Sequence, residues 1–180
     1  MRFTAIFTAA TLIASAADAQ KSTETGPGRG GSPHFKSEWT IDGAAIAISY
    51  GRPSLKGRPE AQLMPPGQPW RTGADTATRI VTNKSIKFGN VTLAPGTYTI
   101  NTQPGEGSWQ IILGKMETPG QWGVPYKADL EIGRAPMTIA RGASVEQLTI
   151  SIDDTAAGAT LRVEWGTAKA TVPFSVVNGG

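Results

Sequence analysis

Hydrophobic and polar side chains alternate with a period of two along most of the chain from about Ser32 onward. This period is typical of strands with one buried and one solvated face, because successive side chains of a strand point to opposite sides. It is clear in five short runs, at residues 45–50, 109–113, 147–152, 160–165 and 172–176. After the first 19 residues, no stretch of about twelve keeps the helical period of 3.6.

Turn-forming residues separate these runs. Asp42-Gly43 stands between two apolar stretches and predicts a two-residue hairpin loop. Pro95-Gly96 fits the central pair of a type II turn, in which Gly takes a positive φ. About nine or ten short strands joined by tight turns predict an all-β fold, a single antiparallel β-sandwich or barrel-like domain. The pattern does not determine the strand order.

The first 19 residues predict a cleaved export signal. Arg2 is followed by a mostly apolar run, and Ala17-Asp18-Ala19 is a small-x-small cleavage site. The apolar run is shorter than the roughly twenty residues that a membrane-spanning helix needs. We therefore expect an exported protein, periplasmic or secreted, with no stable membrane span once the leader is removed.

The next segment, residues 20–31, has a different composition. It holds four Gly and no hydrophobic side chain, so it cannot bury apolar surface to offset the entropy of ordering. It predicts a flexible Gly-rich linker. The folded domain is then expected to span residues 32–177.

Composition excludes several classes of function. The chain has 180 residues, enough for one domain with a core of its own. It has no Cys and one His, which excludes disulfides, a thiolate nucleophile and histidine-rich metal sites. The net charge of +3, from 17 basic and 14 acidic residues, is too small and too scattered for a nucleic-acid-binding surface. We expect no nucleic-acid partner, no metal and no cofactor.

One segment interrupts the strand rhythm. Gly51–Pro69 contains five Pro and three Gly, which predicts a long Pro-rich loop that is stiff, because Pro fixes φ. Connections this long in compact domains are usually functional or disordered. The charge here is one-sided, with four cations against one acid between positions 52 and 71.

Motifs in and around this loop also carry a resemblance. They are the strings SPH (32–34), YGRPSLKGR (50–58), WRTGAD (70–75), LAPGTYTI (93–100) and GQWG (120–123). In this order they resemble an uncharacterised family of exported bacterial proteins, domain of unknown function 2911, over nearly the whole chain after the leader. The resemblance implies a leader peptide and one mainly β domain, and implies no reaction. Thr76 stands where the family pattern usually has a second acid.

The same motifs supply the candidate ligand-binding residues. They are His34, Tyr50, Arg52, Arg58, Trp70, Arg71, Asp75 and Trp122. An arginine fork binds carboxylates or phosphates bidentately, and aromatic rings pack against organic ligands. The leading hypothesis is a non-enzymatic binding module for a small anionic or polar ligand. A structural interpretation stays open, in which Arg71 pairs with Asp75 and Arg52 binds loop carbonyls.

Catalytic signatures are weak. The chain has no Gly-x-Ser-x-Gly nucleophile elbow. His34, Asp75 and a serine are the residue types of a catalytic triad, although chain order is no evidence for one. An envelope hydrolase that uses His34 and Asp75 is therefore the alternative hypothesis. A structural or partner-binding envelope protein with no small ligand is a third.

Overall fold

The computed structural model describes residues 20–118, 126–156 and 158–177. The described residues form ten strands, one short α-helix and one 3₁₀ turn. The elements are β1 (Lys21–Gly26), β2 (His34–Ile41), β3 (Ala44–Gly51), α1 (Glu60–Leu63), β4 (Ala74–Thr82), β5 (Ile86–Phe88), β6 (Val91–Leu93), β7 (Gly96–Gln103), β8 (Trp109–Lys115), η1 (Ala128–Leu130), β9 (Glu131–Thr155) and β10 (Gly158–Val176). The predicted leader, residues 1–19, lies outside the described residues.

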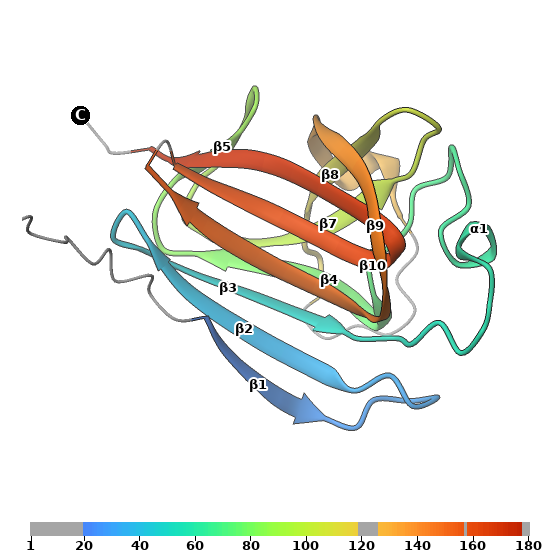
Figure 1. Cartoon of the computed structure of the whole chain (residues 1–180). Coiled ribbons are helices and arrows are strands. Elements are labelled where there is room, and N and C mark those ends of the chain that lie inside the picture. Colours follow the sequence, from blue (N-terminus) through green and yellow to red (C-terminus); the bar gives the residue numbers. More distant parts are fainter. Residues whose placement is uncertain (1–19, 119–125, 157, 178–180) are drawn as a thin grey trace, which may run out of the picture.

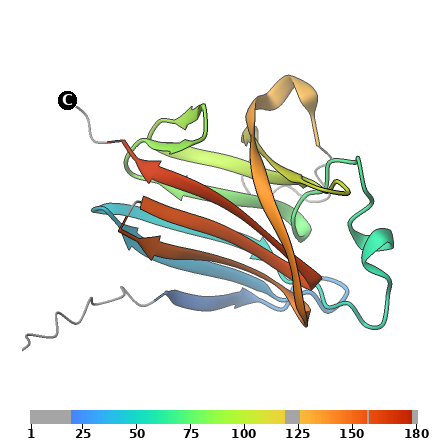
Figure 2. The same ribbon diagram turned by 45° about the horizontal axis from the view of Figure 1, so that its top comes forward.

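Neighbouring strands are antiparallel throughout one ten-stranded sheet. Its order is β1-β2-β3-β4-β7-β8-β9-β10-β5-β6, so β1 and β6 are edges and the sheet is not closed. Figures 1 and 2 show that the sheet turns back on itself, so that β9 and β10 lie across β2, β3 and β4. The prediction of an all-β antiparallel fold is confirmed.

The long strand β9 joins the two layers. Its residues 131–137 pair with β8, and its residues 138–155 pair with β10. β10 in turn pairs with β5 through residues 174–176. One strand that changes partner along its length therefore makes both layers part of a single sheet.

The core lies between the layers, where the alternation places it. Ile46 and Ile48 of β3 and Leu148 and Ile150 of β9 are buried in one hydrophobic cluster. The β2–β3 hairpin turns at Asp42-Gly43, where φ is 48° and 72°, as a type I′ turn requires. The type II turn predicted at Pro95-Gly96 is wrong: Gly96 has no positive φ and begins β7 opposite Thr82.

The N-terminal segment differs from the sequence prediction. Residues 21–26, predicted as part of a flexible linker, form the edge strand β1 against β2. Almost every β1 side chain is exposed, so the composition correctly indicates that little is buried. The strand is held by ladder hydrogen bonds to β2, which hydrophobicity does not reveal.

The segment predicted as one long loop is partly ordered by contacts with the other layer. It contains α1, and Ser54 forms an isolated bridge with Gln147 of β9. This portion of β9 has β10 on one side only, since β8 pairs with residues 131–137. The Tyr50 hydroxyl accepts a hydrogen bond from the Ile150 N–H (2.9 Å), and the Pro53 carbonyl accepts one from the Leu148 N–H (3.0 Å).

Helix α1 is fastened to β10 at the point where it faces a bulge in β9. The Glu60 carboxylate accepts hydrogen bonds from the Thr167 N–H (2.5 Å) and from Arg141 Nη1 (2.6 Å). Gly166, at φ 60°, lies in β10 opposite the bulge, and a Cβ there would come within 2.3 Å of the Glu60 carboxylate. Burial would raise the pKa of Glu60, but the hydrogen bonds from Thr167 and Arg141 outweigh it and lower that pKa.

The Tyr50 contact predicts a measurable loss of stability. In Tyr50→Phe the buried Ile150 N–H loses its acceptor, so we expect the free energy of unfolding to fall by about 1–3 kcal/mol. Urea denaturation would measure it. The matched control is Tyr98→Phe, whose hydroxyl donates to the Ala94 carbonyl (2.9 Å) at an exposed position, and which should cost less than about 1 kcal/mol. Equal losses in the two variants would contradict the assignment.

Candidate functional site

A cleft of about 620 Å³ lies where the turn after β1, the Pro-rich segment and the start of β4 meet. Residues that are far apart in the sequence line it together. They include Arg29, Arg58, Trp70, Arg71, Asp75 and Trp165. The three arginines outnumber the one acid, so the lining has a net positive charge. Trp70 and Trp165 supply aromatic surface.

Two of the arginines are held by backbone carbonyls. Arg58 donates from Nε to the Leu55 carbonyl (2.9 Å) and from Nη2 to the Ser54 carbonyl (2.7 Å). Arg71 donates from Nη1 to the carbonyl of Asp75 (3.2 Å). Within the described ranges, neither guanidinium forms an ion pair with a carboxylate. Their positive charge is therefore presented to the cleft.

Asp75 holds the wall of the cleft together. Its Oδ2 accepts hydrogen bonds from the Arg29 N–H (2.7 Å) and from His34 Nε2 (3.0 Å). The side chain is only 11% exposed, and its φ of 66° is unusual for a residue other than Gly. The carboxylate thus joins the turn after β1 to the first residue of β2, while its backbone carbonyl positions Arg71.

The aromatic surface is a stacked tryptophan pair. The rings of Trp70 and Trp165 lie 5.5 Å apart between centroids and 13° from parallel. Trp165 is buried in β10 and donates from Nε1 to the Glu146 carbonyl (3.1 Å). Trp70 is half-buried, and its backbone pairs with Thr102 of β7. Trp70 therefore offers a fixed, partly accessible ring beside Arg71.

The structure brings together four of the predicted residues, Arg58, Trp70, Arg71 and Asp75, but not all eight. Tyr50 is buried between the layers, and burial raises the pKa of its hydroxyl. Arg52 donates to the Leu148 carbonyl and the Thr149 hydroxyl, both at 2.9 Å, and lies over the Phe35 ring. These two residues fasten the layers instead of lining the cleft.

The remaining two predicted residues have different outcomes. His34 contacts Asp75 but lies on the other side of it, away from the cleft lining. Trp122 lies outside the described residues. The structural alternative for Arg71 holds in a modified form, because Arg71 binds the backbone carbonyl of Asp75 and not its carboxylate.

Among the charged and aromatic residues of the cleft, the sequence prediction missed two. Arg29 belongs to the segment predicted as a linker, and Trp165 to a strand whose alternation indicates a core residue. The four Gly around Arg29 suggest a turn, and at Gly28 a Cβ would lie 1.8 Å from the Ser32 carbonyl oxygen. No local signal shows that this turn meets Asp75, which is 46 positions away.

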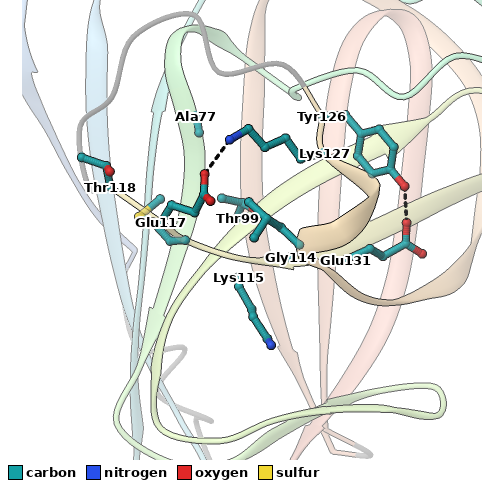
Figure 3. Close-up of a pocket in the computed structure, with 11 residues that line it drawn as sticks. Ala77, Thr99, Gly114, Lys115, Glu117, Thr118, Tyr126, Lys127 and Glu131 are labelled. Carbon is teal, nitrogen blue, oxygen red and sulfur yellow. Dashed lines mark hydrogen bonds and ion pairs between the residues drawn. The ribbon is translucent and has the colours of Figure 1, made fainter.

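A second hollow, near η1, is a weaker candidate. Its volume is about 30 Å³, close to that of a single water molecule. Figure 3 shows two pairs among its side chains, Lys127 with Glu117 (2.6 Å) and the Tyr126 hydroxyl with Glu131 (2.5 Å), while Lys115 points away from both. The hydrogen bond from Arg134 lowers the pKa of Glu131, which stays ionised at neutral pH. These groups satisfy one another and leave little room for a ligand.

The described residues carry few features of other site types. In residues 20–118, 126–156 and 158–177, no group of three or more His, Asp or Glu side chains is arranged to hold a metal ion. In the same ranges, no helix is both long and apolar enough to cross a membrane. Among them, too, no Ser or Thr hydroxyl makes a hydrogen bond to the His34 ring.

The anchoring role of Asp75 predicts a change in local opening. In Asp75→Asn the left-handed backbone is tolerated, but the charged acceptor of the Arg29 N–H becomes a neutral amide. We expect trypsin to cleave after Arg29 about fivefold faster, since a loss of about 1 kcal/mol raises local opening by that factor. Asp154→Asn, at an exposed position of β9, is the control. Unchanged cleavage in Asp75→Asn would show that the carboxylate does not hold the turn.

Comparison with known proteins gives a family and no activity. No curated protein and no solved structure matches the chain. One family model matches residues 32–174, which is most of the chain and includes nearly all of the cleft and the sheet. On that match, the chain belongs to the DUF2911 family of proteins of unknown function.

Proposed function

We propose that this protein binds a small organic anion in the Arg58–Arg71–Trp70 cleft, and that it does so after export. The observation that carries the proposal is the pair Arg58 and Arg71, which share one cleft and have no carboxylate partner within the described ranges. Export rests on the leader predicted for residues 1–19.

The hydrogen-bonding capacity of the two guanidinium groups supports an anionic ligand. A guanidinium has five N–H donors in a planar fork. Arg58 uses two of them on loop carbonyls and Arg71 uses one on the Asp75 carbonyl. These bonds fix the orientation of each fork and leave donors for a carboxylate or phosphate. A fixed fork also loses less side-chain entropy when the ligand binds.

The size and lining of the cleft support an organic ligand. Small-molecule sites usually have volumes of about 300–1,000 Å³, and this cleft has about 620 Å³. Trp70 and Leu63 supply apolar surface next to the arginines. We therefore propose a ligand with an acidic group for the arginines and a ring or other flat body for Trp70.

The alternative, a hydrolase, has one observation in its favour. The His34–Asp75 hydrogen bond (3.0 Å) is the contact that orients the base in many hydrolases. An activated water would have to serve as nucleophile, with His34 as its base. Turnover of an ester panel that is lost in His34→Ala would favour this alternative over a binding module.

The binding proposal predicts that the two arginines contribute separately to affinity. Calorimetric titration with benzoate, glucuronate and phenyl phosphate at low ionic strength is the measurement. We expect one of these probes to bind, and Arg58→Gln and Arg71→Gln each to weaken it by about tenfold or more, because each removes a charge-assisted hydrogen bond. Arg71→Lys should recover part of the loss, since it keeps the charge but not the fork.

The matched control is Arg162→Gln on β10. Arg162 forms a surface ion pair with Asp153 and does not line the cleft, so affinity should be unchanged. The proposal fails if none of the probes binds the wild-type protein, or if Arg162→Gln weakens binding as much as the cleft variants do.

A further inference from the structure

Strand β4 carries a large bulge next to Asp75. Ser49 pairs with Arg79 and Gly51 pairs with Ala74, so the four residues 75–78 of β4 face the single residue Tyr50 of β3. The left-handed φ of Asp75 begins this bulge, and the Thr78 hydroxyl closes it by donating to the Thr72 carbonyl (2.8 Å). Bulges of this kind bend a strand and are common beside functional sites.

A further pocket, distinct from the cleft and from the hollow near η1, lies beside this bulge on the outer side of the sheet. Its volume is about 200 Å³, and it shares no lining residue with the cleft. Polar side chains of four strands line it: Thr25, His34, Lys36, Ser49, Thr76 and Arg79. Neither Asp nor Glu is among its lining residues, although the carboxylates of Glu38 and Asp75 pair with two of its basic groups.

Within the described residues, some polar side chains of this pocket already have a hydrogen-bond or ion-pair partner, and others do not. Lys36 forms an ion pair with Glu38 (2.6 Å), His34 binds Asp75, and the Thr25 hydroxyl donates to the His34 carbonyl. In the part of the chain that the structure describes, Arg79 forms no ion pair with a carboxylate. Ser49 and Thr76 place hydroxyl donors beside it.

We propose that this pocket binds a tetrahedral oxyanion, sulfate or phosphate, with Arg79 as the principal ligand. Ser49 and Thr76 would donate hydrogen bonds to it. The pocket is smaller than the usual range for organic ligands, which favours a compact ion. Arg79 lies on the outer face of β4 opposite Ser49, at the end of the bulge, whose residues 75–78 pair with neither β3 nor β7.

The test is a titration with sulfate, and in parallel with phosphate, at constant ionic strength, followed by backbone amide NMR shifts. We expect saturable shifts at Ser49, Thr76 and Arg79. In Arg79→Gln the affinity should fall by about tenfold or more, and Arg79→Lys should keep part of it. Saturable, local shifts separate binding from the general stabilisation that sulfate gives by exclusion from protein surfaces.

The double variant Arg58→Gln/Arg71→Gln is the matched control, since it removes the cleft arginines and should leave the oxyanion affinity unchanged. Amide spectra of each variant without added ion verify the fold. Two results would overturn the proposal: shifts that do not saturate in the wild-type protein, or equal affinity in Arg79→Gln. The cleft proposal is judged by its own probes, so either proposal can fail alone.

Discussion

The rest of the structure depends on how one edge of β9, the edge that faces away from β10, obtains its hydrogen-bond partners. Thr149 and Ile150 of this strand pair with β10 on one side and residues 146–148 form a bulge opposite β10, so the other edge needs hydrogen-bond partners inside the protein. Residues 50–55 supply them, including a bond from the Leu55 N–H to the Glu146 carbonyl (2.9 Å). Because the same short stretch ends β3, it ties the two layers of the sandwich directly and fixes where the Pro-rich segment begins.

The cleft follows from that closure. The Ser54 and Leu55 carbonyls that orient Arg58 belong to the stretch that pairs with β9. The sheet therefore holds the Arg58 guanidinium in position. Asp75, also in the lining, combines a left-handed backbone with hydrogen bonds from the turn after β1 and from β2. Sites held by ordered backbone in this way need little rearrangement on binding, because the donors already point in fixed directions.

The sequence predicts the parts of this architecture that depend on local pattern. Period-two alternation identifies the strands that carry Ile48 and Ile150, and Asp42-Gly43 identifies the hairpin, because burial and turn chemistry act over a few residues. It does not predict β1, whose order comes from backbone pairing alone. Arg52 and Arg58 also look alike in the sequence, yet the first crosses to β9 and the second lies at the cleft. That difference depends on contacts more than 90 positions apart, which no local pattern encodes.

One consequence concerns Gly166, whose lack of a side chain leaves the space that the Glu60 carboxylate occupies. Any side chain at this position would occupy the space of the Glu60 carboxylate and would also have to adopt a left-handed backbone. Glu60 begins α1, and α1 carries Gln62 and Leu63 to the cleft. The shape of the cleft is thus sensitive to a strand residue that does not line it. Substitutions in the part of β10 that anchors α1 would therefore change the shape of the cleft, although these residues do not line it.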